Sequence, residues 1–221
     1  MIIKAIIFDM DGVLVDSVES NFKSFNMVLK KYNVKLNLNE SQKYIGRALS
    51  NQIEMWKKDF NIKEEIDPQE FSKEAFQYQM KLIRDELKPD EDILNLINSS
   101  KDKGIKIAVA TSSTKFRAEE ILKLLNIYDK LDAFVTKEDV SRHKPAPDTF
   151  LKASSLLNIN PKNCVVIEDA TNGIEAANLA EMFSIAKLTK YHTKEDFESI
   201  ADYIFEDFSE ITIEKLIEEC K

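Results

Sequence analysis

Acidic side chains and small hydroxyl groups occur where apolar segments of this sequence end, and a loop adds one lysine. The set comprises Asp9 and Asp11 after 2–8, Thr111 with Ser112 and Ser113 after 105–110, Glu168 and Asp169 closing 163–168, and Lys144 in the loop HKPAP at 143–147. Parallel strands place their carboxyl ends at one edge of a sheet, and ligands bind beyond that edge. We therefore expect these side chains to share one crevice.

The chemistry that fits this set is phosphoryl transfer. Carboxylates that face one crevice repel each other unless a cation lies among them, and an all-oxygen ligand set suits Mg²⁺. A carboxylate such as Asp9 can attack phosphorus and form an aspartyl-phosphate. Asp11 can then protonate the leaving alkoxide and later deprotonate the attacking water. Lys144, the metal and the Thr111 hydroxyl are the groups available to balance the phosphoryl charge.

The elements that must position these residues follow from the apolar pattern. After Pro89, strands alternate with helices, which predicts β-α-β units and a parallel sheet covered on both faces. The expected strands are 2–8, 105–110, 133–136, 163–168, 183–188 and 202–206, and the expected helices of this part are 90–102, 115–126, 147–158, 172–182 and 209–220. Between 17 and 84 the residues favour helices, around 40–46, 50–60 and 68–86. The sequence thus predicts an α/β fold: a Rossmann-like three-layer core of 1–16 and 85–221, with an all-helical insert at 17–84.

Composition excludes several other classes of protein. With only four glycines in 221 residues, the chain has neither a G-x-G-x-x-G nor a P-loop motif. A net charge of −8 argues against nucleic acid or anionic membrane as a partner. Cys164 and Cys220 give no disulfide framework, and no apolar run approaches the ~18 residues of a membrane span. The N-terminus does not have the pattern of a signal peptide. We expect a cytoplasmic protein, a monomer or at most a weak dimer.

Four segments carry a resemblance to a known family. FDMDGVLVDS at 8–17, ATSS at 110–113, HKPAPD at 143–148 and VVIEDATNGIEAA at 165–177 resemble the four motifs of the haloacid dehalogenase superfamily, in the right order. The helical insert resembles the cap domain of the β-phosphoglucomutase and phosphoglycolate-phosphatase-like branch. The resemblance implies a metal-binding, Mg²⁺-dependent hydrolase with a catalytic core and a cap.

The resemblance also implies a role for each matching residue. Asp9 matches the nucleophile and a metal ligand, and Asp11 matches the general acid/base, whose main-chain carbonyl also contacts the metal. The remaining matches are Thr111 as the hydroxyl that bonds the phosphoryl group, Lys144 as the charge-balancing lysine, Glu168 and Asp169 as the acidic pair that holds Mg²⁺, and Ser112 as a main-chain N–H donor to the phosphate.

Three features of the insert and its boundary bear on the substrate. Arg47, in Gly46-Arg47, falls where related caps place a loop that faces the core, so it is a candidate to bind a second anionic group. A surface arginine after a helix-ending glycine is an equally good interpretation. Asn21 stands where resembling mutases carry a histidine, which argues against mutase activity. The segment 89–92, PDED, replaces a usual Pro-Gly turn.

The leading hypothesis is a phosphatase that hydrolyses a small phosphomonoester, a sugar phosphate or similar metabolite. The first alternative is a phosphomutase similar to β-phosphoglucomutase. A dehalogenase is a further alternative, against which Asp11 counts, because that branch lacks the second aspartate of the first motif. A catalytically silent protein that binds a phosphorylated ligand is the alternative from another class.

Overall fold

The protein is described by a computed structural model, in which residues 2–37, 43–44 and 49–220 are placed. The chain divides into two compact units, residues 1–16 with 88–221 and residues 17–87. The second boundary lies three residues beyond the expected one at 84, because the last helix of the inserted unit continues to Glu86. Within the described ranges, no helix combines the length and apolar character needed to cross a membrane.

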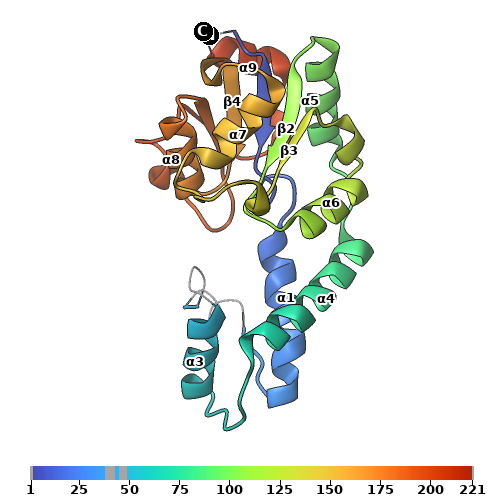
Figure 1. Cartoon of the computed structure of the whole chain (residues 1–221), viewed down its shortest axis with the longest axis vertical. Helices are drawn as coiled ribbons and strands as arrows, with labels where there is room; N and C mark the ends of the chain where they lie inside the picture. Colours follow the sequence, from blue (N-terminus) through green and yellow to red (C-terminus); the bar gives the residue numbers. More distant parts are fainter. Residues whose placement is uncertain (1, 38–42, 45–48, 221) are drawn as a thin grey trace. The chain divides into compact units, whose positions relative to one another are not determined.

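The first unit is built on a six-stranded sheet in the order β3-β2-β1-β4-β5-β6, in which all the pairings are parallel. The strands are β1 (Ala5–Phe8), β2 (Lys106–Ala110), β3 (Ala133–Val135), β4 (Cys164–Glu168), β5 (Phe183–Lys187) and β6 (Tyr203–Phe205). The helices of this unit are α5 (Glu91–Asp102), α6 (Lys115–Leu124), α7 (Asp148–Leu157), α8 (Thr171–Leu179) and α9 (Ile213–Glu219). The predicted α/β class and parallel sheet are confirmed (Figure 1).

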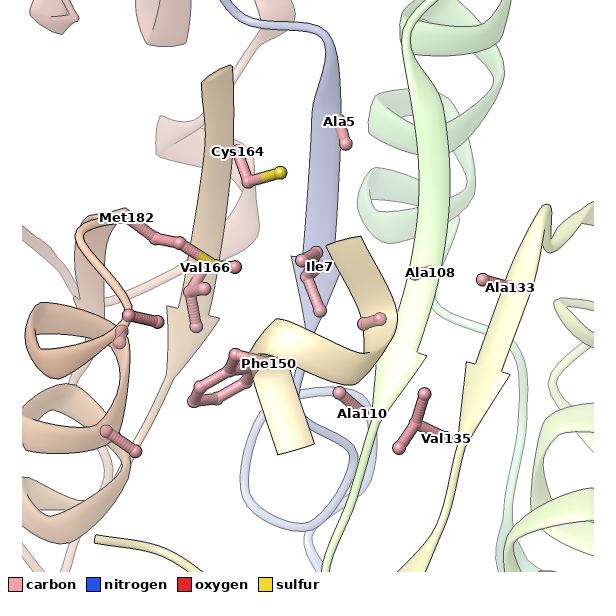
Figure 2. Close-up of a cluster of buried hydrophobic side chains, with 14 residues drawn as sticks. Ala5, Ile7, Ala108, Ala110, Ala133, Val135, Phe150, Cys164, Val166 and Met182 are labelled. Carbon is pink, nitrogen blue, oxygen red and sulfur yellow. The ribbon is translucent and has the colours of Figure 1, made fainter. Parts of the chain in front are cut away.

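Both faces of the sheet are buried, as the apolar strands require. Helices α7 and α8 cover one face, where Phe150 of α7 lies over small and branched side chains of four strands (Figure 2). Helices α5 and α9 pack on each other on the opposite face (Figure 1). Cys164 belongs to the cluster under α7, where it packs as a small apolar side chain. Burial raises the pKa of its thiol to about 12, so it is a poor candidate for thiol chemistry.

Several predicted elements differ from the observed ones at their ends. The first strand begins at Ala5 rather than at residue 2. The helix expected over 209–220 is a short 3-10 turn, Phe208–Glu210, followed by α9, because Asp207 and Thr212 each cap a separate start. The acidic segment 89–92 has a structural explanation, since the Asp90 side chain accepts hydrogen bonds from the first amides of α5. The helix expected at 40–46 lies mostly outside the described residues.

The second unit, in its described residues, is helical. It contains α1 (Ser17–Leu29), a 3-10 turn (Lys30–Tyr32), α3 (Leu49–Asp59) and α4 (Pro68–Glu86). Trp56 is fully buried, with the rings of Phe25, Tyr44 and Phe71 at centroid distances of 5.5–5.8 Å. Asp67 caps α4, and Pro68 occupies the first helical position, where its missing N–H costs nothing.

Candidate active site

The strand order reverses between β1 and β4, because the chain crosses from β3 over to β4. Crevices at such a reversal are where open parallel sheets bind ligands. Asp9 follows β1, and its amide donates to the carbonyl of Ile167 in β4 at 2.9 Å. Glu168 is the last residue of β4 and Thr111 follows β2. The fold therefore brings the residues after β1, β2 and β4 to one edge.

Lys144 reaches this edge from the loop between β3 and α7. Its ammonium lies 2.5 Å from Asp9 Oδ1 and 2.8 Å from Glu168 Oε1, and all three side chains are at most 8% exposed. The ring of Phe150 lies beneath it, 4.6 Å from Nζ to the centroid. A lysine in this loop would ordinarily be solvated, so its burial between two carboxylates makes it part of the site.

The charges at this edge are not balanced by one ammonium. Burial would lower the pKa of Lys144, but the negative charges of Asp9 and Glu168 outweigh burial and raise it. Burial raises the pKa of Asp9 well above its ordinary value; Lys144 opposes this shift, and Glu168 and Asp11 add to it. Burial and the charge of Glu168 also raise the pKa of Asp169 to about 7. Asp9, Glu168 and Asp169 therefore need more positive charge than one ammonium supplies if all three are to be ionised together, and a bound cation would supply it.

Two glycines allow the acidic pair to lie against the backbone. Gly12 has φ +87°, and a Cβ on it would come within 1.9 Å of Asp169 Oδ2. A Cβ on Gly173 would come within 1.8 Å of Glu168 Oε1. Any side chain at position 12 would thus displace Asp169, and any side chain at Gly173, in the first turn of α8, would displace Glu168. Glu168 Oε2 accepts from the amides of Asp169 and Ala170 at 2.6 and 2.7 Å, which fixes the turn after β4.

The donor set fits a hard divalent cation, because all its ligands are oxygens. The Asp169 carboxylate lies against the turn that follows Asp9 and Asp11, because it is close enough to Gly12 of that turn to exclude a Cβ there. Glu168, in contrast, has its two oxygens engaged by Lys144 and by two amides. Over residues 2–37, 43–44 and 49–220, no three acidic, histidine or cysteine side chains already surround a common point in metal-binding geometry.

Asp11 has a different set of partners from Asp9. Arg117, in the first turn of α6, donates from Nη2 to Asp11 Oδ1 at 2.7 Å and from Nη1 to Oδ2 at 2.8 Å. Ser113 Oγ donates to Oδ2 at 2.7 Å and lies 2.5 Å from Arg117 Nη1. Sequence reasoning did not single out Arg117. The available signal was a charged residue at the core-facing spacing of α6, beside Ala118, Ile121 and Leu122.

The hydroxyl residues after β2 have distinct local roles. Thr111 is buried, and its Oγ1 accepts from the Ser113 amide at 3.0 Å, which closes the turn. Ser112 is exposed at the same strand end. The N-cap of α6 is Thr114, whose Oγ1 accepts from the Arg117 amide, so Thr111, Ser112 and Ser113 precede the cap of this helix.

Of the two candidate residues of the inserted unit, Asn21 lies within the described residues and Arg47 does not. Asn21 is exposed on α1, and its Oδ1 accepts from Nε2 of the buried Gln79 of α4 at 2.6 Å. Arg47 lies outside the described residues, so its role stays a prediction. Phe71 of α4 and Trp56 lie in the interior of this unit, and the partly buried Tyr78 packs against them.

The model of the haloacid dehalogenase-like hydrolases matches residues 6–187 of this chain. The chain belongs to this family. A β-phosphoglucomutase of Bacillus subtilis strain 168 is 32% identical over 189 residues, which cover 82% of each chain. The fructose-1-phosphate phosphatase YqaB of Escherichia coli K12 is 32% identical over 187 residues, 81% of this chain and 94% of the relative.

Solved structures of the family agree with this assignment. A β-phosphoglucomutase from Clostridium difficile superposes with a TM-score of 0.77 at 26% identity, covering 99% of this chain and 97% of that one. The resemblance drawn from the four motifs is therefore confirmed, as is the prediction of an enzyme of the haloacid dehalogenase type. The family includes proteins named as phosphatases and as phosphomutases, so family membership leaves these two activities to be separated by the site.

Proposed function

We propose that the protein is a Mg²⁺-dependent phosphatase that hydrolyses a small phosphomonoester, a sugar phosphate or similar metabolite, through an aspartyl-phosphate on Asp9. The observation that carries the proposal is the buried contact of Lys144 with Asp9 and Glu168 at the strand-order reversal. It combines a carboxylate nucleophile and a fixed cation in a dry environment, which phosphoryl transfer requires. Relatives named as phosphatases of fructose 1-phosphate and of phosphorylated carbohydrates support the substrate class.

In the first half of the proposed reaction, an oxygen of Asp9 attacks phosphorus and the bond to the leaving alkoxide breaks. Asp11 gives its proton to that alkoxide. In the second half, water attacks phosphorus, its proton passes to Asp11, and the electron pair of the P–O bond returns to the Asp9 carboxylate. Inorganic phosphate leaves, and Lys144 offsets the phosphoryl charge throughout. Thr111 and the Ser112 amide are the proposed contacts of the phosphoryl oxygens.

A bound Mg²⁺ would supply positive charge to the phosphoryl oxygens and to the nucleophile. The carboxylates of Asp9 and Asp169 and the main-chain carbonyl of Asp11 are the groups that we propose hold it. Glu168 contributes indirectly rather than as a metal ligand, because its oxygens orient Lys144 and the turn that carries Asp169. This division refines the expectation that both members of the acidic pair are ligands.

The unit 17–87 is proposed to serve as the cap that selects the leaving group. Arg47 remains our candidate for a second anionic group of the substrate, and Arg47→Ala would then raise KM for bisphosphates more than for monophosphates. Asn21 would contribute through its amide, whose carbonyl is held by Gln79. An amide does not take up a proton at neutral pH, so Asn21 cannot replace the histidine found at this position of resembling mutases.

A phosphomutase is the second candidate, favoured by the relatives named β-phosphoglucomutase. It predicts that β-glucose 1-phosphate becomes glucose 6-phosphate faster than it releases phosphate. Product analysis by ³¹P NMR separates the two candidates. Isomerisation that outpaces hydrolysis would replace the phosphatase proposal, and Asn21→His would then be expected to accelerate it further.

The decisive experiment is phosphate release from a panel of metabolite phosphates, with Mg²⁺ or with EDTA. We expect turnover of at least one sugar phosphate that requires Mg²⁺ and disappears in Asp9→Asn. A folded protein that turns over no member of the panel under either condition would revive the alternative of a silent phosphate-binding protein.

A further inference from the structure

Arg117 is buried in the core unit although it carries a permanent charge. The residue is 8% exposed and belongs to α6, whose neighbouring positions Ala118, Ile121 and Leu122 are fully buried. Removing an arginine from water is costly unless its donors are paired. The two bonds to Asp11, at 2.7 and 2.8 Å, supply that pairing. Arg117 is thus held by the packing of a helix, and the Asp11 carboxylate is held by Arg117.

The geometry of the Arg117–Asp11 pair fixes the orientation of the Asp11 carboxylate as well as pairing its charge. A guanidinium binds a carboxylate in a planar fork, so two parallel bonds define the plane of the Asp11 side chain. Ser113 adds a third bond to the same carboxylate, 2.7 Å long. The Ser113 backbone is itself fixed, because its amide donates to Thr111 Oγ1 and its carbonyl accepts from the amide of Lys137.

We infer that Arg117, assisted by Ser113, is a positioning residue that orients Asp11 as the base for the second half of the reaction. The inference rests on the proposed aspartyl-phosphate mechanism. In that step the water oxygen bonds to phosphorus, the water proton goes to Asp11, and Asp9 is released as a carboxylate. A carboxylate aimed by a fixed fork meets the water in one orientation, whereas an untethered one samples several and slows the step.

A substrate with a good leaving group isolates this step. The nitrophenolate of p-nitrophenyl phosphate leaves without being protonated, so phosphorylation of Asp9 does not depend on Asp11. If Arg117 acts on dephosphorylation, the Arg117→Ala enzyme forms the aspartyl-phosphate at the normal rate and then accumulates it. We expect a burst of about one nitrophenolate per enzyme, followed by a steady-state rate that is about 10- to 100-fold lower than in the wild type.

A double-mutant cycle tests whether Arg117 acts through Asp11. Four enzymes are compared in Mg²⁺: the wild type, Arg117→Ala, Asp11→Asn and the double variant. We expect the Arg117 substitution to change the rate less than about 3-fold in the Asp11→Asn background. Lys123→Ala is the matched control, because it removes a cation from the same helix that pairs with Glu119 and not with Asp11. It should leave the burst and the steady-state rate unchanged.

Circular dichroism of each variant establishes that it is folded, and two milder changes guard against loss of structure. Arg117→Lys keeps the charge without the fork, and Ser113→Ala removes one bond to Asp11. Both should show smaller losses than Arg117→Ala, with the burst retained. Equal losses in both Asp11 backgrounds, or a burst that falls together with the steady-state rate, would overturn the positioning role. If the wild type releases no nitrophenolate, or Asp9→Asn keeps its turnover, the proposed function itself fails.

Discussion

At the edge of the core sheet, charged side chains are buried against one another, whereas the interior of the helical unit is built from aromatic rings. Lys144 and Glu168 are at most 5% exposed, in an ion-pair cluster with Asp9. In the helical unit, Trp56 is equally buried, with Phe25, Tyr44 and Phe71 around it. Burial of the rings favours folding, whereas burial of crowded carboxylates opposes it.

The difference indicates that the charged cluster is retained for chemistry and the aromatic cluster for stability. The charged cluster costs stability and, in the proposed function, supplies the chemistry, so changes there should affect turnover far more than folding. The aromatic cluster supplies stability, so changes there should affect folding first. Each prediction below tests one side of this division.

The largest effect is expected for Asp9→Asn, which removes the proposed nucleophile. Turnover should fall by about 10⁴-fold or more. The midpoint of thermal unfolding should stay the same or rise, because one of the crowded carboxylates is gone and Lys144 keeps Glu168 as its partner. Phosphate release and thermal unfolding of the same preparation provide the measurement. A large loss of stability would contradict the division between the two regions.

Trp56→Ala should lower the free energy of unfolding by about 3–5 kcal/mol, because it opens a cavity among Phe25, Tyr44 and Phe71. Denaturant titration measures the change. Trp56→Phe is the matched control and should cost less, since among the described residues the indole N–H has no hydrogen-bond partner to lose. If the alanine variant costs under about 1 kcal/mol, aromatic packing is not what stabilises this unit.

Lys144→Met should lower turnover by about 10²- to 10³-fold, the loss typical of removing one group that stabilises transition-state charge. The methionine keeps the apolar contact with Phe150, so the protein should remain folded. Lys106→Met is the control, because that lysine is exposed at the start of β2 and pairs with Asp132. Steady-state kinetics that show equal effects for the two lysines would remove Lys144 from the mechanism.

The smallest effect concerns Mg²⁺ and pH. The pKa of Asp169 is raised to about 7 in the folded protein, above the ordinary value near 4. Between these values the metal-free folded state binds a proton that the unfolded state lacks, so stability from this group is lost as pH rises. If Mg²⁺ binds at Asp169 as we propose, it would replace that proton and stabilise the folded state by binding to it.

The rise in thermal midpoint on adding MgCl₂ should therefore be larger at pH 8 than at pH 5.5. Thermal unfolding with MgCl₂ or EDTA at the two pH values measures it, and NaCl at equal ionic strength is the control. An equal shift at both pH values would mean that Asp169 does not hold the metal.

Much of the core was predictable because its signals are local. The strands are apolar runs, and Asp9, Thr111 and Glu168 stand where those runs end, so parallel pairing alone brings them together. The burial of Lys144 depends on a loop and on Phe150, which no apolar periodicity reveals. Only the motif HKPAPD at 143–148 indicated that Lys144 belongs to the site. Arg117 was missed because a charge inside an amphipathic helix is usually solvated, and only the position of Asp11 reveals its counter-charge. The ends of β1 and α9 were set by capping and pairing that the apolar pattern does not contain.

The position of β1 at the centre of the sheet has a consequence for how the protein is made. Ala5 pairs with Lys106 on one side and with Cys164 on the other, so both neighbours of the first strand are synthesised long after it. The helical unit, in contrast, is complete by residue 87. During translation the helical unit can fold before β2 and β4 are synthesised, while the apolar residues of β1 are still unpaired. The turn that carries Asp9, the proposed nucleophile, is synthesised before the helical unit, and the candidate active site can form only after β4 has been synthesised.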